Sequence, residues 1–401
     1  MTPFLQICTI LVILLLAAKS AGYLSTKFGQ PSVLGELIVG IILGPSIINI
    51  FHFSFLDYSE LPIFINDFAE IGVLLLMFIA GLELQLSDLA KNKAASAYAG
   101  ILGVLAPVLL GFLMGELFSM DSDHSLFLGL TLGATSVSIS AQTLIELKVL
   151  RSRVGFGLLG AAVFDDMLVI LLLSGFIALQ SGGSVFEILM VLIKMIAFLG
   201  LSLAFGYWIL PKFSKRIQAL PIAQGTITLA LVIMFVYGVA AEILGGMAAI
   251  TGSFIAGLMY ARTKEKKDIE RGLRSLSYGL FVPIFFINIG LHIDIHGMGI
   301  SSLWLLMAIS IVAIIGKIIG AGLGARLGKF TWLESLQLGV GMVSRGEVGL
   351  IVATVGLQEN LLNPDLYSSI VGMVLITTLI TPPLLRASFL KTTKIINPSQ
   401  A

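Results

Sequence analysis

Long apolar stretches recur along the whole chain, and their length restricts its fold more than any other feature. Thirteen of them are long enough to cross about 30 Å of hydrocarbon as helices. They cover approximately residues 4–24, 32–50, 68–86, 94–118, 125–146, 155–180, 186–211, 222–243, 246–262, 276–292, 302–325, 334–357 and 366–388. Only 12% of the 401 residues are charged, whereas about a quarter are charged in a water-soluble domain. We therefore predict an all-α membrane protein with 13 transmembrane helices.

The connections between these helices carry lysine and arginine in alternation. Every second connection, starting after the first helix, contains basic residues, and the other six contain none. The basic residues are Lys19, Lys27, Lys91, Lys93, Lys148, Arg151, Arg153, Lys212, Lys215, Arg216, those within 262–274, Arg326, Lys329, Arg386, Lys391 and Lys394. Because basic connections stay in the cytoplasm, the pattern predicts a multi-pass protein of the cell (inner) membrane with its N-terminus outside and its C-terminus in the cytoplasm.

Composition also bounds the partners of the chain. The balance of 24 basic and 23 acidic residues gives no sign of nucleic-acid binding. The single cysteine, Cys8, excludes an intrachain disulfide and a cysteine metal cluster. We expect no cofactor.

Two pairs of segments resemble each other in glycine spacing and apolar pattern. The pairs are 34–43 with 251–260, and 75–84 with 283–293 around Gly81 and Gly290. The paired helices are seven apart in the predicted order, so they cross the membrane in opposite directions. We predict two inverted six-helix repeats joined by a linker helix at 186–211, a common build of secondary transporters. A chance similarity between apolar, glycine-spaced helices is the alternative.

Two consecutive aspartates, Asp165 and Asp166, lie near the middle of the apolar stretch 155–180. One charged residue at that depth costs roughly 2.5–3.5 kcal/mol, and neighbouring carboxylates also repel each other. At about 100° of rotation per residue, one side chain can face an aqueous cavity while the other faces a protein partner. A buried carboxylate that takes either a proton or a cation predicts exchange of the two. The alternative, an acid that only pairs with a base, fits one aspartate better than two.

Three basic residues remain inside the apolar stretches: Lys194, Lys317 and Arg345. Lys317 lies among glycines that permit close helix contact, and we predict a salt bridge from it to Asp165 because an unpaired buried ammonium is costly. A lysine that snorkels to the membrane surface is the alternative, and it is the interpretation we prefer for Lys194.

Small polar residues interrupt two apolar stretches at mid-membrane depth, at 133–141 and 341–349. Unwound backbone at this depth survives only where it lines a protein cavity. We expect helices 5 and 12 to be discontinuous there, with Arg345 and Glu347 satisfying each other or the broken helix ends. Thr135 and Ser136 can supply neutral oxygens to a cation, or they can pack helices as small hydroxyl residues often do.

Together these motifs resemble the monovalent cation:proton antiporter-2 family, especially its bacterial sodium/proton members. The motifs are Asp165-Asp166 shortly after Leu-Gly-Ala-Ala-Val, Lys317 within Gly-Lys-Ile-Ile-Gly, and Ser-Arg-Gly-Glu-Val-Gly-Leu-Ile-Val-Ala at 344–353. They keep the family's order over essentially the whole chain. The resemblance implies that Asp166 is the main cation and proton carrier, that Asp165 is the partner of Lys317, and that helices 5 and 12 form a crossed discontinuous pair. It also implies electrogenic exchange.

The same resemblance implies a homodimer that works by an elevator-like motion. A dimerisation domain would come from helices 1–3 and 8–10 (about 1–90 and 222–297), and a mobile core domain from helices 4–6 and 11–13 (about 94–180 and 302–390). The potassium-efflux branch usually carries a cytoplasmic nucleotide-binding domain, for which the residues after the last helix leave no room. We expect any such regulation to come from a separate cytoplasmic chain.

Four functions compete, and none of the favoured ones is enzymatic. We expect Na⁺/H⁺ antiport, with K⁺/H⁺ antiport on the same fold as an alternative that the sequence separates poorly. An intramembrane aspartyl protease needs two aspartates from different helices that share a proton, whereas these two are consecutive. A cation channel is the most distant alternative, because inverted repeats around one acidic pair argue against a continuous pore.

Overall fold

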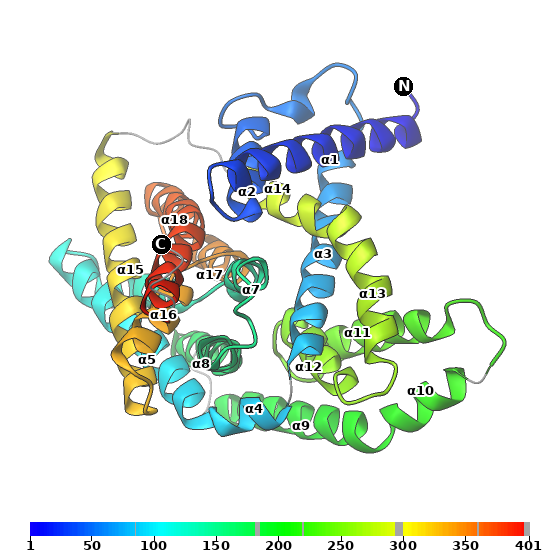
Figure 1. Cartoon of the computed structure of the whole chain (residues 1–401). Coiled ribbons are helices and arrows are strands. Elements are labelled where there is room, and N and C mark those ends of the chain that lie inside the picture. The colour runs from blue at the N-terminus through cyan, green and yellow to red at the C-terminus, as the bar shows by residue number, and fades with distance from the viewer. Residues whose placement is uncertain (85, 181–184, 219, 293–299, 359–360, 397–401) are drawn as a thin grey trace. The chain divides into compact units, whose positions relative to one another are not determined.

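The computed structural model describes residues 1–396, apart from residues 85, 181–184, 219, 293–299 and 359–360. Every regular element in this part of the chain is a helix, and Figure 1 labels most of them. The helices are α1 (Pro3–Lys27), α2 (Ser32–Leu43), α3 (Leu61–Glu83), α4 (Leu86–Lys91), α5 (Lys93–Leu117), α6 (Ser122–Gly133), α7 (Val137–Glu146), α8 (Arg153–Gln180), α9 (Val185–Trp208), α10 (Leu210–Gln218), α11 (Gly225–Ile243), α12 (Ala249–Tyr260), α13 (Lys266–Leu276), α14 (Val282–Leu291), α15 (Ile300–Leu327), α16 (Trp332–Gly341), α17 (Glu347–Gln358) and α18 (Pro364–Ile396), with short turns at Ile50–His52 and Ser277–Phe281.

Within the described residues, ten helical segments are long and apolar enough to cross a membrane. They coincide with ten of the 13 predicted stretches. The other three stretches, 32–50, 246–262 and 334–357, contain only shorter helices. The all-helical membrane fold is therefore present, and the full count of 13 crossings stays a prediction.

One helix is shorter in the structure than the sequence predicts. The stretch 32–50 was expected to be helical throughout, but α2 ends at Leu43. Gly44 follows with an extended backbone (ψ −178°), and Pro45 comes next. A residue that precedes proline is disfavoured in the helical conformation, and glycine is a poor helix former. The apolar character of residues 44–50 was therefore misleading about their conformation.

The chain forms two compact units. The first unit comprises Met1–Asp67, Asn92–Asp165 and Pro283–Ala401, and the second comprises Phe68–Lys91 and Asp166–Val282. The boundary passes through α8, so this helix contributes residues to both units. The dimerisation and core domains expected from the sequence divide the chain elsewhere and stay predictions, and the boundary expected near residue 297 lies outside the described residues.

In the first unit, α15 packs against α5, α16 and α18, and Figure 1 shows α15, α16 and α18 beside one another. Glycines set the distance between α15 and α5. A Cβ atom added to Gly320 would lie 2.3 Å from the carbonyl oxygen of Leu102, and one added to Gly324 would lie 2.2 Å from that of Tyr98. No side chain fits at either point. The glycines around Lys317 therefore bring its helix into direct main-chain contact with α5.

The segments that the sequence pairs as repeats make matching contacts, each within one unit. In the first unit a Cβ on Gly40 of α2 would lie 2.2 Å from Ile287 O of α14, and in the second unit a Cβ on Gly257 of α12 would lie 2.0 Å from Phe78 O of α3. Gly40 and Gly257 occupy the same position in the paired segments. The inverted relation of the two halves stays a prediction. At both crossings, however, a glycine lies directly against a carbonyl oxygen of the neighbouring helix.

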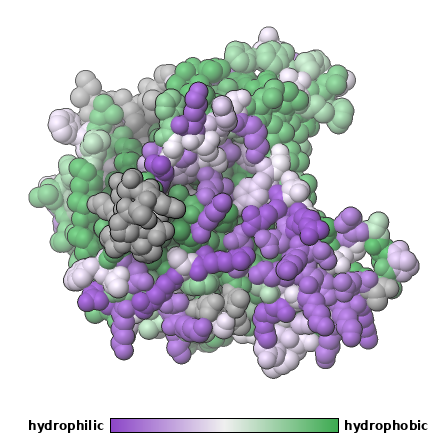
Figure 2. Space-filling view, viewed as in Figure 1, coloured by the Kyte–Doolittle hydropathy of each residue, from purple (hydrophilic) through white to green (hydrophobic). Residues whose placement is uncertain are grey.

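Exposed apolar side chains distinguish the surfaces that face lipid. In the first unit α1 exposes Phe4 and Leu16, and in the second unit α9 exposes Leu201, which is 71% accessible. Figure 2 shows apolar residues over α1 and hydrophilic residues gathered over α10 and α13. Extended apolar exposure of this kind is stable in a bilayer and not in water. Lys194 of α9 is also exposed, and its snorkelling to the membrane surface stays a prediction.

Candidate functional site

Both aspartates lie near the middle of α8, and both are buried. Asp165 is 1% exposed and Asp166 is 6% exposed. Asp165 belongs to the first compact unit and Asp166 to the second. Because consecutive residues of a helix point about 100° apart, the two carboxylates have separate surroundings.

Asp165 is paired with a buried cation. Lys317 of α15 donates from Nζ to Asp165 Oδ1, and the lysine side chain is 0% exposed. Arg345 is also close enough for its charge to interact with that of Asp165. The second carboxylate oxygen, Oδ2, has no hydrogen-bond partner among the described residues. Lys317 is thus a partner of Asp165 and not a lysine that reaches the surface, and the pair compensates two charges that are expensive to bury singly.

Asp166 has a neutral partner. Thr251 of α12 donates its hydroxyl hydrogen to Asp166 Oδ2, with 2.9 Å between the two oxygens. The threonine is 3% exposed. The sequence interpretation missed this residue, although it opens the repeated segment 251–260. The only available signal was a polar side chain in the first turn of an apolar helix, which is too common to single out a site.

The two stretches predicted to be discontinuous are interrupted in the first unit. α6 ends at Gly133 and α7 starts at Val137, while α16 ends at Gly341 and α17 starts at Glu347. The unwound segments are bonded to each other: Ser136 N donates to Ser344 O at 2.9 Å, and Ser344 Oγ donates to Ser136 O at 2.5 Å. These contacts replace backbone hydrogen bonds that continuous helices would otherwise make.

Arg345 lies in one of these interruptions and is completely buried. Its guanidinium donates to the carbonyl oxygens of Leu132 at 2.9 Å, Ala313 at 3.1 Å, Met342 at 3.2 Å and Val343 at 2.8 Å. Leu132 and Met342 stand at the C-terminal ends of α6 and α16, where carbonyls lack helical partners and carry partial negative charge. Arg345 therefore caps two broken helices at once.

The remaining predicted residues have less defined contacts. Thr135 is 3% exposed, and its hydroxyl has no hydrogen-bond partner among the described residues. Ser136 Oγ lies 3.0 Å from Ser138 Oγ. Glu347 is the first residue of α17, and its side chain lies outside the described part of the structure. A buried hydroxyl without a partner is costly, so Thr135 marks a position where an ion or a water molecule would be stabilised.

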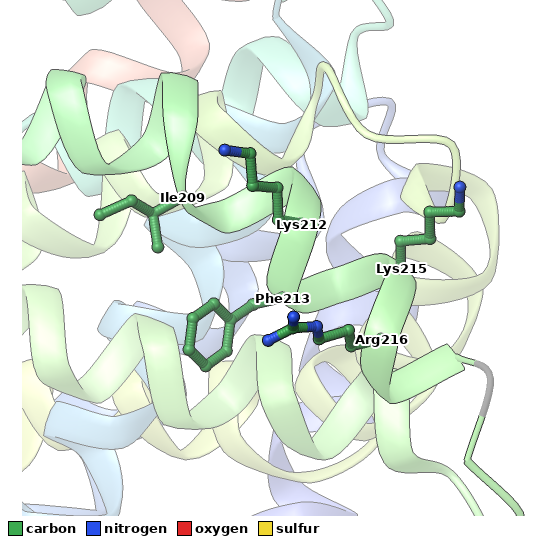
Figure 3. Close-up of a pocket in the computed structure, with 5 residues that line it drawn as sticks. All are labelled: Ile209, Lys212, Phe213, Lys215 and Arg216. Carbon is green, nitrogen blue, oxygen red and sulfur yellow. The ribbon is translucent and has the colours of Figure 1, made fainter.

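A hollow of about 500 Å³ lies elsewhere, at the junction of α9 and α10 (Figure 3). It is lined by Ile209, Lys212, Phe213, Lys215 and Arg216. Three of these five residues are cationic and none is acidic, so this hollow repels the cations that the aspartates attract.

Comparisons with known proteins agree along nearly the full length of the chain. A family model described as "Sodium/hydrogen exchanger, transmembrane" matches residues 11–389. The chain is 43% identical to the probable Na⁺/H⁺ antiporter GerT of Bacillus cereus, over 94% of this chain and 98% of that protein. It is 39% identical to the Na⁺/H⁺-K⁺ antiporter GerN of the same organism, over 94% and 95% of the two chains.

The fold is also similar to a solved one. The sodium proton antiporter MjNhaP1 from Methanocaldococcus jannaschii, solved at pH 8, superposes with a TM-score of 0.66 over 98% of this chain and 97% of that one. The two are only 17% identical, so this likeness concerns the fold alone. With its buried aspartates, its interrupted helices and a match over residues 11–389, the chain belongs to the transmembrane sodium/hydrogen exchanger family, which consists of secondary transporters and not of enzymes.

Proposed function

We propose that this chain exchanges Na⁺ for H⁺ across the cell membrane, with Asp166 as the carrier of both ions. One observation carries the proposal: two adjacent buried carboxylates have different partners. Asp165 is held by the ammonium of Lys317, whereas Asp166 accepts a hydrogen bond from the neutral hydroxyl of Thr251. Membership of the sodium/hydrogen exchanger family supports the same assignment.

The chemistry follows from the cost of burying charge. A carboxylate at this depth is stabilised by a proton or by a cation, but binding of one displaces the other. Asp166 therefore carries either ion across in alternate steps. Asp165 keeps its charge because Lys317 compensates it. Exchange of one proton for one Na⁺ at the single carboxylate of Asp166 moves no net charge. We therefore propose that the electrogenic exchange implied by the family resemblance involves a second proton, which the Lys317 ammonium of the pair releases.

The proposed machinery retains the architecture expected from the sequence. Helices of about 1–90 and 222–297 form a dimerisation domain in a homodimer, 186–211 is the linker helix, and helices of about 94–180 and 302–390 form a core that moves in an elevator-like manner. The interrupted helices cross beside the ion, where Thr135 and Ser136 serve as ligands while Arg345 and Glu347 support the broken ends. The unpartnered hydroxyl of Thr135 supports its role.

The orientation and the regulation are also proposals. The alternation of basic connections supports an external N-terminus and a cytoplasmic C-terminus. The basic residues Lys212, Lys215 and Arg216 of α10 would then lie at the cytoplasmic surface. A separate cytoplasmic chain would provide any regulation by nucleotide.

K⁺/H⁺ exchange is the second candidate function. The printed name of one relative, GerN, includes K⁺ together with Na⁺ and H⁺, and this relative is 39% identical to the chain. Both candidates use the same aspartate and differ in the size of the ion that the surrounding oxygens accept.

Proteoliposomes test the proposal. Purified protein is reconstituted with an imposed proton gradient, and the recovery of a quenched pH-sensitive dye is followed after addition of Na⁺, K⁺ or Li⁺. Wild type should respond to Na⁺ at the lowest concentration, and Asp166→Asn should lose at least about 100-fold in rate because an amide binds neither ion as an anion does. Normal exchange by Asp166→Asn would refute the carrier assignment. A voltage probe compares wild type with Lys317→Ala; unaltered charge movement would remove Lys317 from the coupling step.

A further inference from the structure

Thr251 stands at the start of a helix that is itself held firmly in place. α12 begins at Ala249, so Thr251 lies in its first turn. A Cβ atom added to Gly252 would lie 2.1 Å from Tyr237 O of α11, which leaves no room between these two helices. The next residue, Ser253, donates its hydroxyl to Leu74 O of α3 at 2.6 Å. A close main-chain contact at Gly252 and a side-chain hydrogen bond at Ser253 therefore fix where the Thr251 side chain projects.

The hydroxyl points at the carboxylate from this fixed position. Thr251 Oγ1 and Asp166 Oδ2 are 2.9 Å apart, the threonine is 3% exposed and the aspartate 6%. Hydrogen bonds between a hydroxyl and a charged carboxylate are stronger than those between neutral groups. This contact therefore favours the charged form of Asp166.

A hydroxyl can also serve the cation-bound form. Its oxygen has two lone pairs, and a hard monovalent cation takes neutral as well as charged oxygens as ligands. When a cation binds Asp166, the hydroxyl hydrogen can turn to a carbonyl three or four residues earlier, as it does for threonines within helices, and the oxygen then faces the ion. One side chain thereby stabilises both the empty and the loaded site.

We propose that Thr251 is a specificity-determining residue of the cation site, which supplies a neutral oxygen ligand to the monovalent cation bound by Asp166. This inference rests on the proposed function of Asp166. A smaller cation is more strongly hydrated and loses more when a ligand oxygen is missing, so the residue favours Na⁺ over K⁺. Removal of the hydroxyl should weaken Na⁺ binding more than K⁺ binding.

The test compares Thr251→Val with Thr251→Ser, which differ in whether a hydroxyl remains. Exchange rates are measured in proteoliposomes over a range of Na⁺ and K⁺ concentrations. The valine variant should raise the KM for Na⁺ about tenfold, equivalent to roughly 1.4 kcal/mol, with a smaller rise for K⁺ and little change in the maximal rate. The serine variant should stay within about twofold of wild type for both ions.

Three results would overturn the inference. If Thr251→Val has the wild-type KM for both ions, the hydroxyl is not a ligand. If Thr251→Ser is as impaired as Thr251→Val, or if both ions are affected equally, the residue acts by packing alone. Thr251→Ala replaces the valine variant if the latter fails to fold. The rise in melting temperature on addition of Na⁺, measured in detergent, provides a second readout that should shrink in Thr251→Val and persist in Thr251→Ser.

Controls separate this inference from the function on which it rests. Wild type and Asp166→Asn are assayed in the same preparation. If wild type shows no cation-driven proton movement, or if Asp166→Asn equals wild type, the proposed function fails whatever Thr251 does. If both behave as expected and Thr251→Val is unchanged, only the role of Thr251 fails.

Discussion

The surroundings of Asp165 and of Asp166 differ more than their adjacency in the chain implies. Asp165 faces Lys317, with the charge of Arg345 nearby, whereas Asp166 faces the hydroxyl of Thr251. Under the proposed function, Asp165 is therefore a structural charge and Asp166 an exchangeable one, although both lie on the same helix. The difference suggests a rule that the variants below test: the partner of a buried acid, and not its burial, decides whether it binds a transported ion.

The largest expected effect tests whether Asp165 is structural. Asp165→Asn leaves the ammonium of Lys317 buried without its counter-charge, so the free energy of unfolding should fall by about 3–5 kcal/mol. This free energy is measured by denaturation of the protein in mixed micelles. Asp166→Asn is the matched control, because it should fold normally and fail only in transport.

The double variant Asp165→Asn/Lys317→Met sharpens this comparison. It removes both buried charges, so it should recover much of the stability that Asp165→Asn loses. Equal unfolding free energies of Asp165→Asn and Asp166→Asn would show that Lys317 does not depend on Asp165 for its stability.

A smaller effect is expected at Arg345. Arg345→Lys keeps the charge but cannot span four carbonyl acceptors with one ammonium, so we expect a loss of about 2 kcal/mol in unfolding free energy. Lys194→Arg, on the exposed surface of α9, should stay within about 0.5 kcal/mol of wild type. An unchanged unfolding free energy in Arg345→Lys would mean that the broken helix ends need only a nearby charge.

The last comparison sets a glycine on the helix of Lys317 against a glycine on α9. Gly320→Ala pushes a methyl group against Leu102 O, 2.3 Å away, and should cost about 1–3 kcal/mol. Gly200→Ala on α9 meets nothing within 4 Å and should instead stabilise by about 0.5–1 kcal/mol. Thermal unfolding of both variants checks the opposite signs. Stabilisation by Gly320→Ala would contradict the close contact of α15 with α5.

The sequence predicted the charged part of this arrangement because isolated charges in apolar helices have few stable solutions. That ground predicts an acidic partner for Lys317, and helical geometry with the family resemblance selected Asp165. The interruptions at 133–141 and 341–349 were also visible, since small polar residues stand out in apolar runs.

What the sequence could not predict depends on contacts between distant residues. Thr251 lies 85 positions from Asp166, and a threonine in an apolar helix is ordinary. Arg345 was expected near broken helix ends, but its bonds to Leu132 and Ala313 depend on how α6 and α15 pack. The early end of α2 at Leu43 was missed because hydropathy ignores the effect of Gly44 and Pro45 on the backbone.

The glycine crossings of α2 with α14 and of α12 with α3 have a consequence for how this chain can evolve. At Gly40 and Gly257 any larger residue would overlap a carbonyl oxygen, at 2.2 Å and 2.0 Å. Substitution of either glycine therefore cannot be used to adjust the distance between the helices. Adaptation of this transporter to temperature or pressure is therefore confined to residues away from the crossings, while the crossings themselves have only one permitted amino acid.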